Sequence, residues 1–169
     1  MDPFRLVGTW DFRREIRHAD GAEYSADGEA RFSVEDDGRV RWAEHGTLRW
    51  AAGTTPVTRT LFIVREAVRE APSGGLLDDG SDDRATDGSA PRWRVTFEDG
   101  RDFHPWTAGA VEHLCGRDLY QGGIEAPARQ APSWELRWHV TGPEKDYLMH
   151  TWYTSAERGT TVGSLRSAR

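Results

Sequence analysis

Hydrophobic and polar residues alternate with a period of two along most of the chain, as in β-strands that bury one face. In the first run, Trp10, Phe12, Arg14 and Ile16 share one face, and the residues between them share the other. Further runs of this kind lie at 29–34, 39–44, 47–50, 57–66, 93–97, 102–106, 119–124, 134–140 and 147–153. The pattern predicts about ten strands, spaced as in a sandwich or barrel.

Turn signals separate these runs. Residues 35–38 (EDDG) and 98–100 (EDG) end in glycine, which tolerates the positive φ of tight turns. His45 and Gly46 are expected to end one strand before a separate short strand begins at Thr47. Only Ala108–Leu114 is expected to form a short helix. The predicted fold is therefore all-β, a single antiparallel up-and-down barrel of about ten strands.

The length of 169 residues suits one domain, which we assign to 1–169. The stretch 72–91 is rich in Gly, Ser and Asp and nearly free of large apolar side chains, so it is predicted to be a flexible loop. Residues 161–169 are predicted to be a frayed tail.

A Gly-x-Trp sequence, Gly8 to Trp10, stands at the start of the first predicted strand. It resembles the signature of calycins, which include lipocalins, fatty-acid-binding proteins and nitrobindins. The resemblance implies that Trp10 plugs the closed end of a barrel. Nitrobindins carry haem on a histidine near the end of the chain. His150 lies roughly there, but the residues around it depart from the nitrobindin motif, so haem remains only an alternative to a barrel without cofactor.

A second resemblance spans about 4–153, interrupted by the loop at 72–91. It rests on His104 before Trp106, on 113–115 (HLC) and 118–120 (DLY), on the Trp134-x-x-Arg-Trp motif, and on 142–147 (GPEKDY). These motifs resemble a bacterial family of calycin-like domains of unknown function. The resemblance supports the barrel fold and implies no particular reaction.

Composition narrows the classes of partner. The net charge of −6 argues against a nucleic-acid partner, because phosphate binding depends on clustered cations. Cys115 is the only cysteine, so no disulfide forms within the chain. No apolar stretch is long enough to cross a membrane, and the first residues lack the pattern of a signal peptide. We therefore expect a cytoplasmic protein without a membrane partner.

The inward-facing polar residues are the candidates for ligand binding. Arg14 shares a face with Phe12 and Ile16, and a charge there needs a partner, which Glu44 could supply from the face of Val40 and Trp42. Alternatively, Arg14 lies at the rim with its head group in water. Tyrosines and tryptophans on inward faces suit an aromatic or amphiphilic ligand. The candidate ligand-binding residues are Trp10, Arg14, Glu44, Tyr120, Trp138, Tyr147, Thr151 and Tyr153.

His104, His113 and Asp118 lie close together in the sequence and could meet at the mouth of the barrel. A histidine with a carboxylate partner has a pKa suited to acid–base catalysis, so these three are the candidate catalytic residues. Surface or hydrogen-bonding roles are the alternative. No metal site is predicted, because the histidines lack metal-ligand spacing and His139 is expected to face solvent.

The predicted function is a small-molecule-binding barrel with an internal pocket for an apolar or aromatic ligand. One alternative is an enzyme on the same scaffold, an isomerase, cyclase or lyase acting on a secondary metabolite. Another is a protein-interaction module that uses exposed tryptophans. A homodimer formed through edge strands also stays open.

Overall fold

The computed structural model describes residues 1–66, 91–125 and 132–156. Within these residues, a short 3-10 helix and ten antiparallel strands follow one another along the chain. Their bounds are η1 Pro3–Leu6, β1 Gly8–His18, β2 Glu23–Val34, β3 Val40–Trp50, β4 Gly53–Arg65, β5 Trp93–Phe97, β6 Asp102–Pro105, β7 Gly109–Cys115, β8 Asp118–Glu125, β9 Ser133–Thr141 and β10 Asp146–Ser155. The predicted loop 72–91 and tail 161–169 lie outside the described residues, apart from Pro91.

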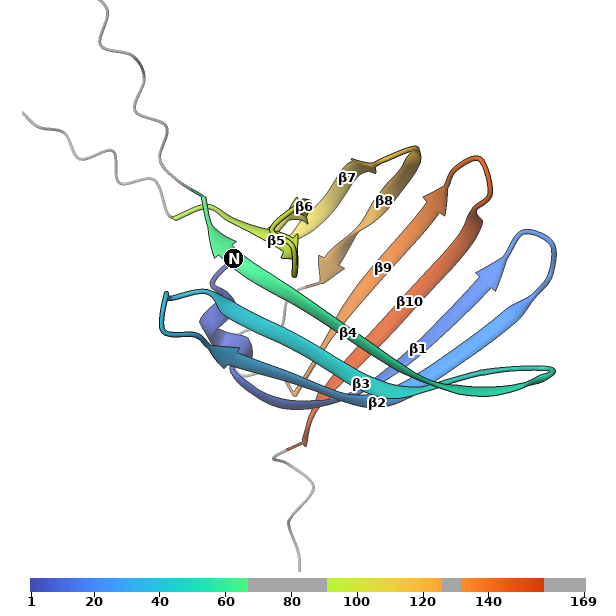
Figure 1. The fold of residues 1–169 in the computed structure, drawn as a ribbon, viewed down its shortest axis with the longest axis horizontal. Coiled ribbons are helices and arrows are strands. Elements are labelled where there is room, and N and C mark those ends of the chain that lie inside the picture. The colour runs from blue at the N-terminus through green and yellow to red at the C-terminus, as the bar shows by residue number, and fades with distance from the viewer. Residues whose placement is uncertain (67–90, 126–131, 157–169) are drawn as a thin grey trace, which may run out of the picture.

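The strands form one sheet in the order β6-β5-β4-β3-β2-β1-β10-β9-β8-β7. The sheet curls until its edge strands β6 and β7 come into contact (Figure 1). Within the described residues, no backbone ladder joins these two edges. Phe103 of β6 instead packs edge-on against His113 of β7 and Tyr120 of β8. The predicted all-β up-and-down barrel is confirmed, and it is nearly closed.

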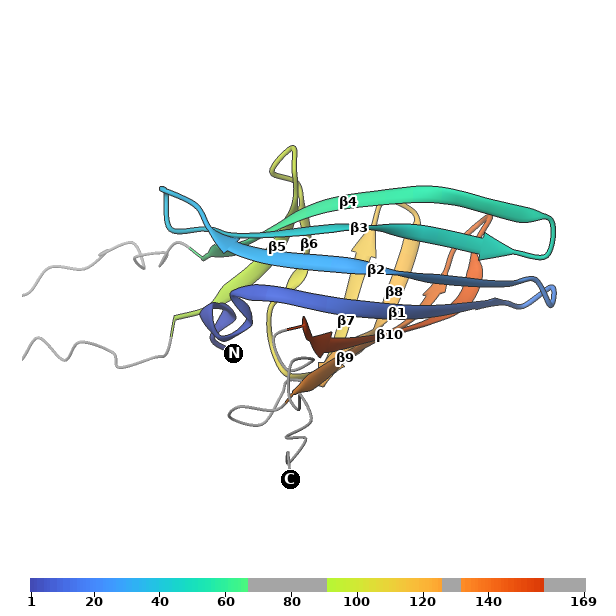
Figure 2. The same cartoon turned by 90° about the horizontal axis from the view of Figure 1, so that it is seen from below.

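The two ends of the barrel differ. Helix η1 lies at one end, and the hairpins β1–β2, β3–β4 and β9–β10 lie at the other (Figure 2). Near η1 the interior is filled by buried aromatic rings: Trp10, Phe32, Trp42, Trp106, Trp134 and Tyr153. Trp134 and Tyr153 stack with their ring centroids 3.9 Å apart. Close packing therefore fills the η1 end of the barrel.

Inward-facing side chains toward the hairpins are only partly buried. Ile16, Tyr24 and Leu48 are half-buried, and so are Tyr147 and Met149 on β10. Ile16 pairs in register with both Tyr24 and Met149, so these side chains share the inner face of adjacent strands. We call the inner surface lined by these five residues the cup. All five side chains are partly exposed, unlike the buried aromatic rings near η1.

The segment 108–114 is a strand rather than the predicted short helix. Residues Gly109–Cys115 pair with β8 from end to end, from Gly109 opposite Ile124 to Cys115 opposite Asp118. Val111 is buried and its neighbours Ala110 and Glu112 are exposed, which is the period of a strand. Pairing with β8 satisfies the backbone and outweighs the helix preference of Ala, Glu and Leu.

Strand β3 runs without a break through His45 and Gly46, so the strand expected at 47–50 is the second half of β3. Gly46 pairs with Gly28 of β2. A Cβ on Gly46 would lie 2.3 Å from the Asp27 carbonyl oxygen, and one on Gly28 would lie 2.1 Å from the His45 carbonyl oxygen. The glycine that signalled a strand end instead allows two strand backbones to approach closely.

No helix within the described residues could cross a membrane, because η1 has only four residues.

Candidate functional site

Arg14 and Glu44 meet inside the barrel, as the strand pattern predicts. Arg14 Nη2 lies 2.8 Å from Glu44 Oε2, although β2 separates their strands. Arg14 is in register with Ala26, and Glu44 is in register with Ala30. These two alanines and Gly28 between them leave the inner face of β2 almost bare, so the longer side chains reach across it.

Glu44 accepts hydrogen bonds from four side chains. Its Oε2 binds Arg14 Nη2, as above, and its Oε1 accepts from Arg59 Nη2 at 2.7 Å. The same Oε1 also accepts from the Tyr153 hydroxyl at 2.6 Å and from Trp42 Nε1 at 3.1 Å. The donors come from β1, β3, β4 and β10. A buried carboxylate with this many donors is fully satisfied and rigidly held.

Thr151 completes this group. Its Oγ1 accepts a hydrogen bond from Arg14 Nε at 2.8 Å, and the residue is completely buried. Thr151 is in register with Arg14, so the bond crosses directly between β10 and β1. We call the six residues Arg14, Trp42, Glu44, Arg59, Thr151 and Tyr153 the Glu44 cluster.

Charge in the Glu44 cluster is unbalanced. Burial alone would raise the pKa of Glu44, but the Arg59 and Arg14 guanidiniums and the Tyr153 hydroxyl outweigh it and lower that pKa to about 2. Burial raises the pKa of Tyr153, and the Glu44 charge raises it further, so Tyr153 stays a neutral donor. At neutral pH the cluster therefore holds two guanidinium charges and one carboxylate charge.

The two guanidiniums lie on the solvent side of the carboxylate. The Glu44 side chain is 3% exposed, whereas those of Arg14 and Arg59 are 11% and 27% exposed. Arg14 is also in register with Ala26, which pairs with Leu48 of the cup. The Glu44 cluster thus forms the floor of the cup, and its guanidiniums are more exposed than its carboxylate.

Several polar atoms beside this floor are buried without a hydrogen-bond partner in the described part of the chain. They include Arg59 Nε, His104 Nε2 and Trp138 Nε1. His104 is 2% exposed, and its ring lies edge-on to Trp138 with centroids 4.9 Å apart. Burial lowers the pKa of His104 to about 4, a shift that the Pro105 carbonyl opposes and the Arg59 charge reinforces. A buried polar atom without a hydrogen-bond partner lowers the stability of the fold, so this group of atoms favours a polar ligand as the missing partner.

Three further candidate ligand-binding residues lie outside the Glu44 cluster. Trp10 lies at the η1 end, away from the cup, and its Nε1 donates to the Leu6 carbonyl oxygen at 2.7 Å. That is the plug implied by the calycin resemblance. Tyr120 and Tyr147 are half-buried on β8 and β10. Burial and the nearby Tyr120 raise the pKa of Tyr147 to about 12, so Tyr147 is a neutral donor at the wall.

The three candidate catalytic residues have separate partners. Asp118 forms an ion pair with Lys145 of the β9–β10 turn. His113 is half-buried on β7, where burial lowers its pKa and the charge of Asp102 opposes that shift. His104 Nδ1 lies 2.8 Å from the carbonyl oxygen of Pro105. No hydrogen bond or ion pair among the described residues joins Asp118 to either histidine.

His139 and His150 lie on the outer face of the sheet. His139 Nε2 is 3.2 Å from Asp146 Oδ1, and His150 Nε2 is 2.7 Å from Glu135 Oε2. His150 therefore faces away from the interior. The described residues contain no group of three or more His, Cys, Asp and Glu side chains arranged to hold a metal ion.

Two residues of the Glu44 cluster, Arg59 and Trp42, were not among the sequence candidates. The run 57–66 has apolar residues on both faces between 61 and 64, which obscures its register. In the structure, Arg59 shares the inner face with Leu61 and Ile63, both at most 1% exposed. A buried run that places one arginine on its inner face is the signal that could have identified Arg59.

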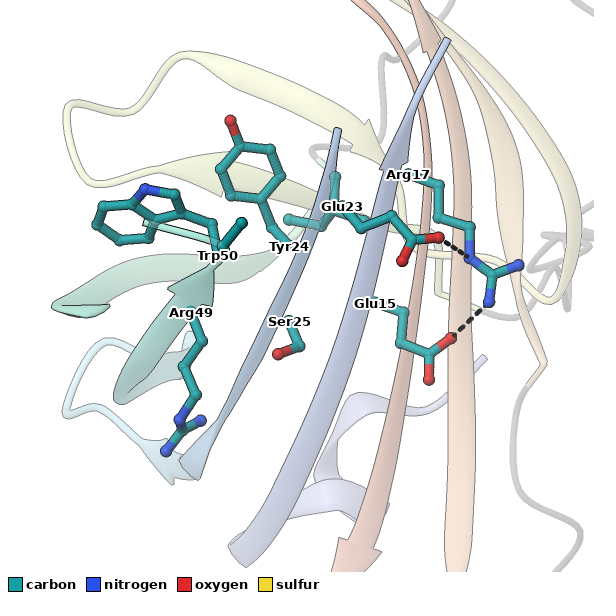
Figure 3. Close-up of a pocket in the computed structure, with 9 residues that line it drawn as sticks. Glu15, Arg17, Glu23, Tyr24, Ser25, Arg49 and Trp50 are labelled. Atoms are coloured by element: carbon teal, nitrogen blue, oxygen red, sulfur yellow. Dashed lines mark hydrogen bonds and ion pairs between the residues drawn. The ribbon is translucent and has the colours of Figure 1, made fainter. Parts of the chain in front are cut away.

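A depression of about 510 Å³ lies where β1, β2 and β3 reach the hairpin end (Figure 3). Tyr24 and Trp50 form its aromatic side. On the other side, Arg17 pairs with Glu15 at 3.4 Å and with Glu23 at 3.7 Å. These charges are exposed and paired with one another, so they would attract a charged ligand more weakly than the guanidiniums of the cup floor.

Comparison with known proteins identifies a family and a fold. DUF6314, a family of unknown function, matches residues 6–70 and 84–155. No curated protein matches the chain. The solved structure of the S-type phycobiliprotein lyase CPES from Guillardia theta is similar, with a TM-score of 0.56, 11% identity, and coverage of 90% of this chain and 88% of that chain.

Designed barrels are also among the similar structures. A de novo fluorescence-activating β-barrel gives a TM-score of 0.41 and 16% identity, covering 90% of this chain and 95% of that chain. The redesigned barrel mFAP1, solved with bound DFHBI, gives 0.41 and 13%, covering 90% and 96%. At such identities, the likeness to the lyase shows a shared barrel fold and nothing more specific.

Proposed function

The chain belongs to the DUF6314 family, and from its own geometry we propose that it binds a small molecule in the cup, with the Glu44 cluster as the polar anchor. The observation that carries the proposal is a buried Glu44 carboxylate holding two guanidiniums, Arg14 and Arg59, on the inner face of the barrel, with Arg14 two residues before Ile16 of the cup on β1. Barrels of similar size elsewhere enclose one small ligand.

Stability alone is a weak reason for such a cluster. Burying charges costs desolvation energy, and apolar residues of similar volume often serve a protein core as well or better. Above the cluster, the half-buried side chains of Ile16, Leu48, Tyr147 and Met149 offer apolar and aromatic walls with one hydroxyl group, that of Tyr147. A few polar groups within mainly apolar walls are typical of ligand sites.

The pKa values favour binding over acid–base catalysis. A general base works best when its pKa is near the operating pH. His104, at about 4, is a weak base, and Glu44, at about 2, is held ionised by its partners. Near neutral pH, His104 therefore stays neutral and Glu44 stays ionised, so both side chains can form hydrogen bonds without exchanging protons with a ligand.

The tryptophans favour an internal role over a surface for protein partners. Six of the eight, Trp10, Trp42, Trp93, Trp106, Trp134 and Trp138, are at most 9% exposed. Trp50 at the rim is 37% exposed. Most of the tryptophan side chains therefore pack in the core and are not available to a protein partner.

The test is titration with 1-aminoanthracene, a small neutral dye whose emission rises in apolar surroundings. Met149 and Leu148 are adjacent on β10, but Met149 lies in the cup and Leu148 is 58% exposed on the outer face. Met149→Trp should fill the cup and weaken dye binding about tenfold or more, whereas Leu148→Trp should leave it unchanged.

Ile16→Phe on β1 provides a second filling variant if Met149→Trp does not fold. Absence of dye binding by the wild-type protein would contradict the proposal. So would a loss of binding in Leu148→Trp, with or without a loss in Met149→Trp, because both residues line the outer depression of about 570 Å³ and the dye would then lie there.

A further inference from the structure

This inference rests on the proposed function and concerns the chemistry of the ligand. We propose that the cup selects an anionic ligand that also carries a neutral O–H or N–H donor. The guanidiniums of Arg14 and Arg59 would bind the anion, and Nε2 of His104 would accept the hydrogen bond from the donor. A hydroxyl-substituted aromatic carboxylate has this chemistry.

The need for an anion follows from the charge balance of the floor. Arg14 and Arg59 share one carboxylate, Glu44, so one positive charge has no partner in the cluster. The Tyr153 hydroxyl and the Thr151 hydroxyl are neutral and contribute no compensating charge. A carboxylate entering the cup would restore neutrality in surroundings where water is limited.

Donors remain for that anion. Arg59 uses Nη2 to bind Glu44, and its Nη1 makes no hydrogen bond within the described part of the chain. Arg14 uses Nε for Thr151 and Nη2 for Glu44 and Tyr153. A guanidinium has five N–H donors, so both side chains keep donors for a bidentate contact with a carboxylate.

The acceptor follows from the tautomer of His104. Its Nδ1 lies 2.8 Å from the Pro105 carbonyl oxygen, and a carbonyl can only accept, so Nδ1 carries the hydrogen. The neutral ring then leaves Nε2 as a bare lone pair. That atom is buried and has no donor among the described residues. It can therefore recognise an O–H or N–H group on a ligand.

The anion and donor sites belong to one region. His104 packs edge-on against Trp138, with ring centroids 4.9 Å apart. Trp138 in turn pairs with Met149 of the cup. The alternative occupant of Nε2 is an ordered water, which would need no ligand.

The experiment measures, by calorimetry, the binding of three related probes. These are 4-hydroxybenzoate, benzoate and methyl 4-hydroxybenzoate, so that the second lacks the donor and the third lacks the charge. Wild-type protein should bind 4-hydroxybenzoate about tenfold more tightly than either of the others, as expected for a hydrogen bond or charge removed from a buried site.

Variants separate the two contacts. Arg59→Met should weaken both acids about tenfold and leave the ester unchanged, while the exposed Arg31→Met on β2 should change none. His104→Phe should abolish the preference for 4-hydroxybenzoate over benzoate, and His104→Gln, which keeps an acceptor, should restore part of it. The imidazole 15N spectrum gives a second readout, because the Nε2 resonance should move with 4-hydroxybenzoate and not with benzoate.

Equal binding of the ester and the acid would overturn the anion assignment. A preference that survives His104→Phe, or an Nε2 resonance unmoved by every probe, would mean an ordered water only and would overturn the acceptor assignment. If 1-aminoanthracene binds in the cup while none of the three probes does, this inference fails and the proposed function stands. If the dye also fails to bind, both fail.

Discussion

The Tyr153 hydroxyl donates a hydrogen bond of 2.6 Å to Glu44 Oε1, joining two residues that are 109 positions apart in the chain. Strands β1 and β2 lie between their strands in the sheet, so the bond crosses the interior rather than following a ladder. Arg14 on β1 and Arg59 on β4 bind the same carboxylate. Four strands are therefore fastened at one point, directly beneath the cup.

Glu44→Gln should destabilise the protein strongly. The amide removes the charge that compensates Arg14 and Arg59, and leaving one side of a buried ion pair uncompensated costs about 3–5 kcal/mol. Because the Arg59 side chain is 27% exposed, we expect the lower end of that range. Urea unfolding measures the loss. The exposed Glu144→Gln in the β9–β10 turn is the matched control and should change little; an equally small effect at Glu44 would show that the network is not tightly coupled.

Stability should fall in acid in two steps. The pKa of His104 is about 4 in the folded protein and 6.5 in the unfolded chain, so below pH 6.5 the proton binds the unfolded state first. The neutral His104 therefore stabilises the folded protein by on the order of 3 kcal/mol. This contribution is complete above pH 6.5 and is lost as the pH falls toward 4. Glu44, with a pKa of about 2 instead of 4.5, adds a second loss of similar size between pH 4.5 and 2.

Urea midpoints from pH 8 to pH 4 separate the first step from the titration of other histidines. In His104→Phe, the decline between pH 6.5 and 4 should be shallower than in the wild type. The exposed His45→Gln should keep the wild-type slope. Identical slopes in His104→Phe and wild type would show that His104 titrates normally.

The sequence predicts the barrel and one half of its polar floor. Alternation places Arg14 on the face of Phe12, and Glu44 on the face of Trp42, so their pairing follows from the cost of an unpaired inward charge. Arg59 was missed because alternation is obscured where both faces of β4 carry apolar residues, from Leu61 to Val64.

The three candidate catalytic residues are close in sequence but lie on three different strands, and the structure brings only the two histidines to a common neighbour, Phe103. Asp118 begins β8 and meets Lys145 of the β9–β10 turn, whereas His104 on β6 turns toward the interior at the seam of the barrel. Their separation depends on how the sheet closes, which no local pattern encodes. The predicted helix at 108–114 failed for a related reason: pairing with β8 decides its conformation.

Gly28 and Gly46 should tolerate no side chain. A Cβ on either would lie 2.1–2.3 Å from a backbone oxygen of the neighbouring strand, so Gly28→Ala or Gly46→Ala must push β2 and β3 apart. We expect a loss of about 2–4 kcal/mol in urea unfolding, as for overpacked or strained core sites. Gly53→Ala, whose Cβ would meet only the Trp50 ring at 3.6 Å, should cost less than about 1 kcal/mol. Comparable losses at Gly53 and Gly46 would contradict the close approach.

Trp10→Phe should lower the stability of the protein without changing ligand binding, as expected if Trp10 plugs the barrel and does not contact the ligand. The substitution removes the hydrogen bond from Trp10 Nε1 to the Leu6 carbonyl oxygen and part of the packing against Trp134, where the rings lie edge-on at 6.4 Å. A buried carbonyl left without its donor costs about 1–3 kcal/mol, so the urea midpoint should fall. Binding of 1-aminoanthracene should be unchanged, because Trp10 contacts Leu6 of η1, whereas the cup residues lie toward the hairpins. If the variant instead lost dye binding while keeping its midpoint, the ligand would lie at the η1 end, and Trp10 would be a contact residue rather than a plug.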